Sequence, residues 1–319
     1  MTDFTCLELC AGAGGQAIGF ERAGFSHVGL VEIEPDACAT LRSNRPSWRV
    51  IQEDIKKFDG SPYRGVDLLS AGLPCPPFSR AGKQLGHADE RNLFPDALRI
   101  LRECQPRVVM IENVRGILDP AFDYFRLELK ETLAKLGYKS AWKLHNASDY
   151  GVPQLRPRAI LVGVTLNCAA EFSWPRKSFA PPQPVSEVLK DLMLSRGWRG
   201  YRQWSKLART IAPTLVGGSK KHGGPDLGPT RARKAWAQLG VDGLGIANEP
   251  PGRDFSGMPK LTLEMTALLQ GFPPDWQFCG GKTSAYRQIG NAFPPPVAAA
   301  MGRNIQRCLM SKALARAAS

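Results

Sequence analysis

Residues 4–44, FTCLELCAGAGGQAIGFERAGFSHVGLVEIEPDACATLRSN, decide the fold. They begin with a short apolar segment, 4–10, that runs directly into the glycines of AGAGG. The following GQAIGFERAG has the spacing of a helix and stops at Gly24. HVGLVEIE (27–34) is a second apolar segment, and Pro35 suits the first turn of the next helix. Strand, glycine turn, helix and second strand predict the opening of an α/β sheet.

The same alternation continues to about residue 165. Three further apolar segments predict strands, namely VDLLSAG (66–72), RVVMIENV (107–114) and RAILVGV (158–164). Helical periodicity marks residues 91–104 and 122–136, and an Ala-rich helix over 297–316 is expected to pack back on this part of the chain. Strands that alternate with helices of this length predict a doubly wound, mostly parallel, Rossmann-like sheet.

Composition limits the class of protein. The 319 residues are 43% apolar and 22% charged, which is typical of a globular protein and excludes a disordered or fibrous chain. The sequence contains no apolar run long enough to span a membrane, and its first residues lack the basic stretch of a signal peptide. Its 8 cysteines form no C-x-x-C pair and have no His at metal-ligand spacing. We therefore expect free thiols, no metal site and a cytoplasmic protein.

Positive charge is concentrated in one part of the chain. The formal net charge is +13, and residues 171–260 hold 15 Lys and Arg against 7 Asp and Glu. This segment is rich in Pro, Gly and Trp with little periodicity, so it predicts a smaller irregular domain. Such a basic segment indicates contact with an anionic polymer, with a solvated surface as the alternative. Its aromatic residues are expected to form the small domain's core: Trp198, Tyr201, Trp204 and Trp236.

The glycine turn indicates a nucleoside cofactor. Gly12-Ala-Gly14-Gly15-Gln-Ala17 lies between a strand and a helix and fits the pattern G-x-G-x-x-G/A. Glycine allows the backbone to approach a ligand closely because it has no Cβ. Glu32, 20 residues after Gly12, stands where an acid binds ribose hydroxyls. This turn alone leaves NAD and S-adenosylmethionine both open.

A cysteine follows the strand at 66–72. In Leu73-Pro74-Cys75-Pro76-Pro77-Phe78-Ser79 the prolines hold the thiol on a stiff loop, at the sheet edge where open α/β folds bind ligands. Arg80 and Lys83 place positive charge nearby, which favours the thiolate. A structural cysteine would be expected inside the strand. The position of Cys75 therefore predicts a nucleophile.

An acid and two arginines complete the chemical groups. Glu112 closes the apolar strand 107–114, where burial would raise its pKa and make it a proton donor; a structural acid is the alternative. Gln154-Leu-Arg156-Pro-Arg158 precedes the strand 158–164. Alternate residues of an extended segment project to one side, so the two arginines could hold an anion or a carbonyl together.

A thiolate, an acid, a cation and a nucleoside cofactor suit one reaction in particular. C5 of cytosine is a poor nucleophile until a thiolate adds to C6 and turns the ring into an enamine. An acid at N3 and a cation near O2 would stabilise the charge that develops on the ring. C5 could then accept the sulfonium methyl group of S-adenosylmethionine. The four motifs supply these groups at a common sheet edge.

Together the motifs resemble the DNA (cytosine-5)-methyltransferase family. They occur in the order and approximate spacing of that family: Cys10-Ala-Gly-Ala-Gly-Gly15, Pro74-Cys75, Glu112-Asn113-Val114, Gln154-x-Arg156-x-Arg158 and Gly290-Asn291. The resemblance covers about residues 4–165 and 209–302. It implies that Cys75 adds to C6 of cytosine and that Glu112 bonds N3. It also implies that Arg158, with Arg156 beside it, contacts the base.

The resemblance implies binding residues as well. The cofactor would be S-adenosyl-L-methionine, with S-adenosyl-L-homocysteine as its product. Its site would comprise Cys10, Ala11, Gly12, Ala13, Gly14, Gly15, Glu32, Ile33, Asp54, Ile55, Gly72, Pro74, Leu93, Asn291 and Phe293. The target cytosine would be swung out of double-stranded DNA. The DNA contacts would be Ser79, Arg80, Gln84, Lys220, Lys221, Arg231, Arg233 and Lys234.

The expected organisation and partners follow from the resemblance. Residues 1–170 and 284–319 would form a catalytic, cofactor-binding domain, and residues 171–283 a basic target-recognition domain. We expect a monomer that associates with the nucleoid and has no membrane partner. It would belong to a bacterial restriction–modification system, with a cognate restriction endonuclease, or act alone.

Three other functions stay open. A tRNA cytosine-5 methyltransferase would use the same chemistry, and methyl incorporation into DNA or tRNA would separate the two. A Rossmann oxidoreductase would explain the glycine turn but not Cys75, Glu112 and the paired arginines. A DNA-binding regulator with an inactive site is disfavoured because the catalytic set is complete.

Overall fold

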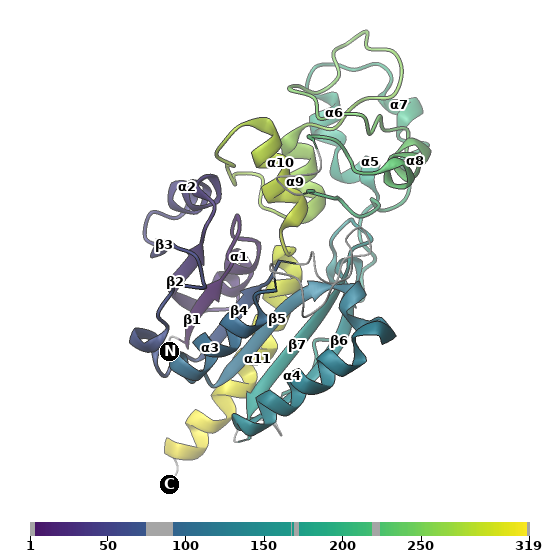
Figure 1. Ribbon diagram of the computed structural model, residues 1–319. Coiled ribbons are helices and arrows are strands. Elements are labelled where there is room, and N and C mark those ends of the chain that lie inside the picture. The colour runs from purple at the N-terminus through teal and green to yellow at the C-terminus, as the bar shows by residue number, and fades with distance from the viewer. Residues whose placement is uncertain (1–3, 75–91, 167, 169–171, 219–223, 318–319) are drawn as a thin grey trace. The chain divides into compact units, whose positions relative to one another are not determined.

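The computed structural model describes residues 4–74, 92–166, 168, 172–218 and 224–317, with side chains as far as Met310 (Figure 1). The chain divides into two compact units. The first comprises residues 1–145, 157–176 and 297–319, and the second comprises 146–156 and 177–296. Among the described residues, no helix combines the length and the apolar character that crossing a membrane requires.

A seven-stranded sheet in the order β3-β2-β1-β4-β5-β7-β6 forms the centre of the first unit, as far as the structure describes it. The strands are β1 Phe4–Leu9, β2 Phe25–Glu32, β3 Val50–Gln52, β4 Leu68–Gly72, β5 Val108–Val114, β6 Tyr138–Asn146 and β7 Pro157–Thr165. The pairs β1–β2, β2–β3, β1–β4 and β4–β5 are parallel, and β5–β7 is antiparallel. The chain runs outward in both directions from β1, so the doubly wound, mostly parallel sheet is confirmed.

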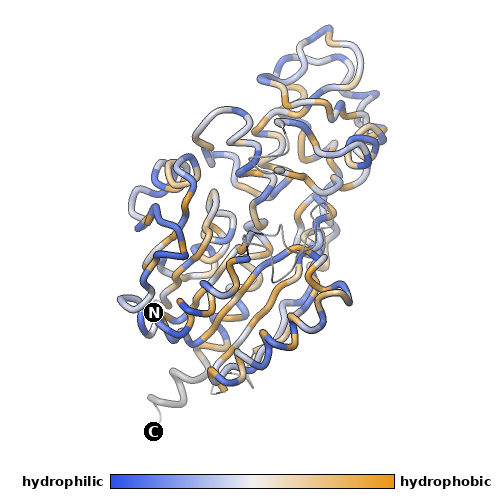
Figure 2. The backbone as a smooth tube through the Cα atoms, viewed as in Figure 1, coloured by the Kyte–Doolittle hydropathy of each residue, from blue (hydrophilic) through white to orange (hydrophobic). Residues whose placement is uncertain are grey.

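Helices cover both faces of this sheet. They are α1 Gly15–Arg22, α2 Pro35–Asn44, α3 Phe94–Cys104, α4 Asp123–Lys135 and α11 Pro295–Ala317. On one face, α3 and α4 pack against apolar residues of β1, β4 and β5. Much of the length of these strands is coloured as hydrophobic in Figure 2. On the other face α11 packs against α1, where a Cβ on Gly302 would lie 2.7 Å from Cβ of Ala23 (Figure 1). The prediction that the C-terminal helix packs on the first part of the chain is therefore confirmed.

The second unit has its own core. Its helices are α5 Val185–Val188, α6 Lys190–Leu194, α7 Tyr201–Trp204, α8 Thr230–Gln238, α9 Leu263–Gln270 and α10 Lys282–Asn291. Trp198, Trp204 and Trp236 are buried at its centre, and Tyr201 packs against them. This confirms the prediction that these aromatic residues form the core of the small domain. At the start of α9, Oγ1 of Thr262 accepts a hydrogen bond from the backbone N of Met265 at 3.2 Å.

The two compact units are divided differently from the predicted domains. Residues 146–156 and 284–296 belong to the second unit, whereas the sequence analysis assigned them to the catalytic domain. Residues 171–176 belong to the first unit. Gln154 and Arg156 form hydrogen bonds to other segments of the second unit, described below.

Candidate active site

The glycine turn joins β1 to α1 through left-handed backbone. Cys10, Gly12 and Gly14 have φ angles of 53°, 54° and 89°. Glycine adopts such angles without strain, so the backbone is unstrained at Gly12 and Gly14. At Cys10 the left-handed angle is unfavourable because the residue has a Cβ. Among the described residues, nothing lies within 4 Å of the position that a Cβ on Gly12 would take. The backbone angle therefore favours glycine at this position, and no described residue fills the space beside the turn.

Glu32, at the end of β2, is bonded to the turn. Its Oε2 accepts from the backbone N of Gly12 at 2.7 Å, and its Oε1 accepts from the backbone N of Glu34 at 2.8 Å. Burial raises the pKa of this carboxyl, while these backbone hydrogen bonds act in the opposite direction. A carboxylate can accept about four hydrogen bonds. Glu32 thus fixes the turn and keeps acceptor capacity for a ligand hydroxyl.

Acidic residues surround the turn. The pKa of the Cys10 thiol is raised, first by burial and then by the negative charges of Glu32, Asp54, Glu8 and Asp96. These four carboxyls contrast with the chain's net charge of +13. A negative environment favours a cationic ligand and opposes a bound pyrophosphate.

Glu8 is a residue that the sequence analysis missed. It lies on β1, is fully buried, and neither carboxyl oxygen has a hydrogen-bond partner among the described residues. Burial, followed by the charge of Glu32, raises its pKa well above the usual range. A charged residue within the apolar segment 4–10 was the available signal, because burying an unpartnered carboxyl is costly.

The ends of three strands meet at Gly72, the last residue of β4. Gly72 pairs in register with Glu112 of β5. A Cβ on Gly72 would lie 2.9 Å from Nε2 of Gln16, 3.4 Å from the backbone O of Cys10 and 3.9 Å from Oε2 of Glu112. Gln16 is buried, and its Oε1 accepts from Oγ of Ser70 at 2.5 Å. The glycine turn and the predicted acid therefore border one point at the carboxyl edge of the sheet.

The predicted nucleophile follows Gly72 by three residues. Cys75 lies outside the described residues, as do Ser79, Arg80 and Gln84. Pro74, the last described residue before Cys75, is exposed at the carboxyl edge. The chain thus leaves β4 beside Glu112 on its way to Cys75.

Glu112 and Arg158 form an ion pair at this edge. Nε of Arg158 lies 2.8 Å from Oε1 of Glu112, and the side chains are 12% and 8% exposed. The two residues come from neighbouring antiparallel strands, β7 and β5. Arg158 thus lies against the carboxyl that the sequence analysis expected to donate a proton, a contact that burial alone did not predict. The structure thus brings the predicted acid and one predicted arginine together.

Arg156 has different partners. Its guanidinium donates from Nη1 to the backbone O of Leu215 at 2.8 Å. It donates from Nη2 to the backbone O of Gly290 at 2.7 Å and of Ala292 at 3.0 Å. The alternate spacing of Arg156 and Arg158 suggested that they could hold one anion or carbonyl together. In the structure their partners differ: Arg156 bonds backbone carbonyls of the second unit, and Arg158 bonds Glu112. Alternate spacing gave no information about these distant carbonyls.

The other predicted cofactor residues differ in their exposure. Ile33, directly after Glu32, is 54% exposed, so its apolar surface is open to a ligand. Oδ1 of Asp54 accepts from the backbone N of Lys56 at 3.0 Å. Ala11, Ala13 and Ile55 are buried, and Leu93 packs against the core of the first unit. In the second unit, Nδ2 of Asn291 donates to the backbone O of Gly218 at 3.2 Å, and Phe293 is buried.

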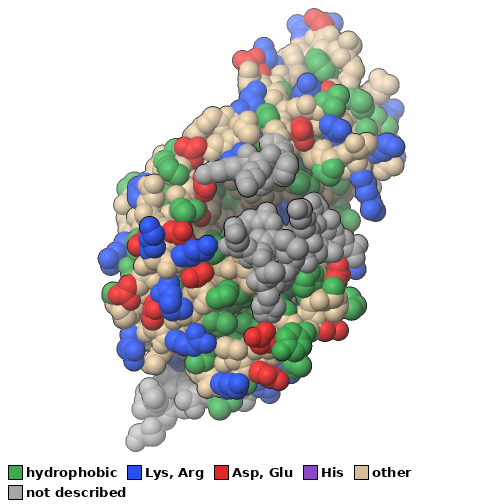
Figure 3. All heavy atoms as spheres, viewed as in Figure 1, with side chains coloured by type: hydrophobic (Ala, Val, Ile, Leu, Met, Phe, Trp, Pro, Cys, Tyr) green, Lys and Arg blue, Asp and Glu red, His purple; other side chains and the backbone are tan. Residues whose placement is uncertain are grey.

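Part of the predicted DNA-binding set is on α8. Arg231 and Lys234 are exposed and Arg233 is half-buried, while Trp236 of the same helix is in the core. Lys and Arg side chains are spread over the visible surface of the second unit (Figure 3). Lys220 and Lys221 lie outside the described residues.

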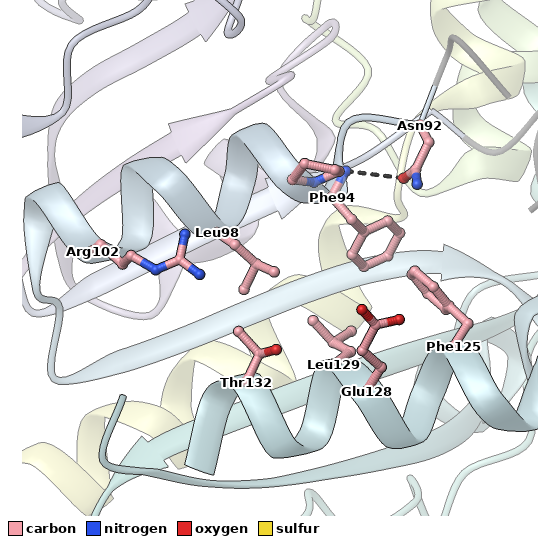
Figure 4. Close-up of a pocket in the computed structure, with 9 residues that line it drawn as sticks. Asn92, Phe94, Leu98, Arg102, Phe125, Glu128, Leu129 and Thr132 are labelled. Carbon is pink, nitrogen blue, oxygen red and sulfur yellow. Dashed lines mark hydrogen bonds between the residues drawn. The ribbon is translucent and has the colours of Figure 1, made fainter. Parts of the chain in front are cut away.

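A groove of about 280 Å³ lies between α3 and α4. Phe94, Leu98, Phe125 and Leu129 line it, and Arg102 and Glu128 project from the two helices (Figure 4). None of the predicted catalytic, cofactor or DNA residues lines this groove. The candidate site therefore remains the carboxyl edge of the sheet.

Comparisons with known proteins identify the family. The sequence profile described as C-5 cytosine-specific DNA methylase matches residues 4–307. The chain is 53% identical to the Type II methyltransferase M.NgoMIV of Neisseria gonorrhoeae, over 96% of this chain and 98% of that protein. It is 52% identical to the Type II methyltransferase M.NaeI of Lentzea aerocolonigenes, over 97% and 76% of the two chains.

Two solved structures share the fold. The DNMT2 mutant of Spodoptera frugiperda aligns with a TM-score of 0.66 at 18% identity, covering 95% of this chain and all 100% of that one. S. pombe Dnmt2 aligns with a TM-score of 0.61 at 16% identity, covering 98% and 99%. The matched profile spans nearly the whole chain, and the two Type II methyltransferases share about half of its residues. This chain belongs to the family of C-5 cytosine-specific DNA methylases.

Proposed function

We propose that this DNA cytosine-5 methyltransferase acts on a cytosine swung out of double-stranded DNA, through a covalent bond between Cys75 and C6. The methyl donor in this proposal is S-adenosyl-L-methionine. The observation that supports the proposal best is the Glu112–Arg158 ion pair, which borders Gly72 three residues before Cys75. A nucleophile, an acid and a cation at one sheet edge are the groups that the reaction needs.

The charge around the glycine turn supports this cofactor over NAD. S-adenosylmethionine supplies a methyl group on a sulfonium and carries an ammonium, so it is cationic where NAD carries a pyrophosphate. The carboxyls of Glu8, Glu32, Asp54 and Asp96 all lie near enough to Cys10 to raise the pKa of its thiol. Glu32 would bind the ribose hydroxyls, and Glu8 would face positive charge of the methionine part. Ile33 would cover the adenine ring.

The protein groups act in sequence on the base. The Cys75 thiolate adds to C6, and the electron pair of the C5–C6 double bond moves into the ring toward N3. Glu112 holds a proton at N3, and Arg158 stabilises the charge at the O2 side and on Glu112. C5 then takes the methyl group. Loss of the C5 proton to a base expels the Cys75 sulfur from C6 and restores the aromatic ring.

DNA binding would use the basic surface of the second unit. Arg231, Arg233 and Lys234 of α8, with Lys220 and Lys221, would contact phosphates and set the register. Ser79, Arg80 and Gln84 would fill the space that the displaced cytosine leaves in the duplex. We further propose that the chain works as a monomer at the nucleoid, beside a cognate restriction endonuclease, since its relatives are named Type II methyltransferases.

A trapping experiment tests the chemistry. Duplex DNA with 5-fluorocytosine at the target should form a covalent complex, because the fluorine at C5 cannot leave as a proton does. Cys75→Ala should abolish both the complex and transfer of labelled methyl groups while DNA binding persists. Cys279→Ala, at a half-buried position of the second unit, is the matched control and should retain both.

The outcomes separate the alternatives. Near wild-type turnover of Cys75→Ala would exclude the nucleophile assignment. If tRNA is methylated and DNA is not, the substrate is tRNA. If calorimetry shows binding of NADH but not of S-adenosylhomocysteine, the cofactor is a nicotinamide nucleotide.

A further inference from the structure

Arg156 is among the most deeply buried side chains of the second unit, at 1% exposure. Its guanidinium reaches three backbone carbonyls, those of Leu215, Gly290 and Ala292, at 2.7–3.0 Å. Burying a guanidinium is costly unless its donors are satisfied, and its planar fork matches several acceptors at once. Arg156 thus joins two segments that are more than 70 residues apart in the sequence.

Two glutamines extend this connection. Gln154 is fully buried, and its Oε1 accepts from the backbone N of Leu215 at 3.0 Å. Its Nε2 donates to Oε1 of Gln270 at 2.7 Å, and Gln270 in turn donates to the backbone O of Ala292. The carbonyl of Ala292 therefore has two side-chain donors, Arg156 and Gln270. The result is one connected set of hydrogen bonds around the segment 290–292.

The backbone at the end of α10 also approaches the segment 215–218 closely. A Cβ on Gly290 would lie 2.5 Å from both N and Cα of Gly217, and a Cβ on Gly217 would lie 2.6 Å from Oδ1 of Asn291. Only glycine fits at both positions. Asn291 is thus placed between two carbonyls held by one guanidinium, with its amide directed at the backbone O of Gly218.

We propose that Arg156 is a positioning residue that fixes Asn291 for cofactor binding and does not contact the cytosine. This inference rests on the proposed function, in which Asn291 contacts S-adenosylmethionine. By the same bonds Arg156 links Asn291 to the segment 215–218, which leads toward the basic residues proposed to bind DNA. Arg156 therefore influences the reaction indirectly, through the affinity of the protein for its cofactor.

The test compares Arg156→Met, Arg156→Lys and Asn291→Ala in the full-length protein. Arg156→Met should weaken binding of S-adenosylhomocysteine in calorimetry by about tenfold, since the carbonyls of Leu215 and Gly290 lose this side-chain donor and that of Ala292 loses one of its two. Turnover at saturating cofactor should stay within about threefold of wild type. Arg156→Lys, whose single ammonium cannot span all three carbonyls, should give an intermediate affinity. Arg202→Met, at an exposed arginine of α7, is the matched control and should bind normally.

Each outcome bears on a different claim. If Asn291→Ala weakens binding and a folded Arg156→Met does not, the positioning role is wrong while the proposed function stands. If Asn291→Ala binds normally, the proposed cofactor role of Asn291 is itself wrong. If Arg156→Met binds normally but loses turnover, Arg156 acts on the reaction and the inference is overturned.

A second variant covers the case in which Arg156→Met does not fold. Gln270→Met removes one of the two donors to the carbonyl of Ala292 and leaves Arg156 in place. It should weaken binding of S-adenosylhomocysteine about threefold without lowering turnover at saturating cofactor. Unchanged affinity in this variant would overturn the proposal.

Discussion

The carboxyl edge of the sheet and the buried cluster of the second unit each contain one arginine of the same short motif. Arg158 pairs with the carboxylate of Glu112 at a partly exposed edge. Arg156, two residues earlier, has its guanidinium among backbone carbonyls and is almost fully buried. An arginine with a carboxylate partner near open space can respond to charge on a substrate, whereas one that satisfies buried carbonyls holds backbone in place. The comparison shows that residue type and spacing alone do not decide a role.

The largest expected effect separates these two arginines. Arg158→Met should lower turnover about a thousandfold, because it removes a cation that would stabilise charge developing on the cytosine. Its affinity for S-adenosylhomocysteine should stay within about twofold of wild type, the reverse of the pattern expected for Arg156→Met. Single-turnover kinetics and calorimetry on both variants make the comparison. If Arg158→Met loses affinity for the cofactor and keeps its turnover, the proposed difference in role between Arg158 and Arg156 is wrong.

The fold was largely predictable because most of its strands are buried runs. The segments proposed as strands correspond to β1, β2, β4, β5 and β7. β3 was missed because it has three residues, and β6 was missed because its side chains alternate between exposed and buried at the edge of the sheet. Apolar runs in a sequence identify strands that are covered on both faces. Short strands and edge strands lack such runs, so they are missed.

The candidate site was predictable only in part. Glu112 stood out as an acid at the end of an apolar strand, and its position at the carboxyl edge followed from the parallel sheet. The partners of Arg156 could not be foreseen, because they are backbone carbonyls at positions 215, 290 and 292. Glu8 carried a signal in the sequence, but its lack of partners is visible only in three dimensions.

A smaller effect should follow from adding one carbon at the carboxyl edge. A Cβ on Gly72 would lie 2.9 Å from Nε2 of Gln16, so Gly72→Ala should displace Gln16 from Ser70 and disturb the end of β4. Turnover should fall about tenfold, since small misplacements near reacting groups are costly. The double variant Gly72→Ala/Gln16→Ala should recover most of this loss. A double variant no better than Gly72→Ala would show that Gln16 is not the cause.

The basic surface of the second unit should affect DNA affinity and its dependence on salt. Replacing Arg231 and Lys234 of α8 by alanine should reduce the slope of log affinity against log salt by about 2, near 0.9 for each phosphate contact. Fluorescence anisotropy with labelled duplex between 50 and 200 mM salt measures this slope. Lys135→Ala, at an exposed position of α4, is the control and should leave the slope unchanged. An unchanged slope in the double variant would place the phosphate contacts elsewhere.

The smallest expected effect concerns stability and contrasts Glu8 with Arg156. Burial raises the pKa of Glu8 above its value in the unfolded chain, about 4.3. Its contribution to stability is therefore fully present below that pH and is lost as the pH rises toward the pKa of the folded protein. Glu8→Gln removes the titrating carboxyl and with it this loss of stability at higher pH. Relative to wild type, the free energy of unfolding of the variant should therefore increase by about 1 kcal/mol between pH 5 and pH 8. Arg156→Met should be less stable than wild type at both pH values, because its carbonyls lose their donors.

Urea unfolding at pH 5 and pH 8, followed by circular dichroism, measures these differences for the three proteins. A pH-independent difference between Glu8→Gln and wild type would mean that Glu8 finds a partner in solution. The gain should come with weaker binding of S-adenosylhomocysteine, because the amide that replaces the Glu8 carboxyl cannot ionise to pair with the ammonium of the ligand. Stability gained without any loss of binding would show that the Glu8 carboxyl has no role in binding the ligand.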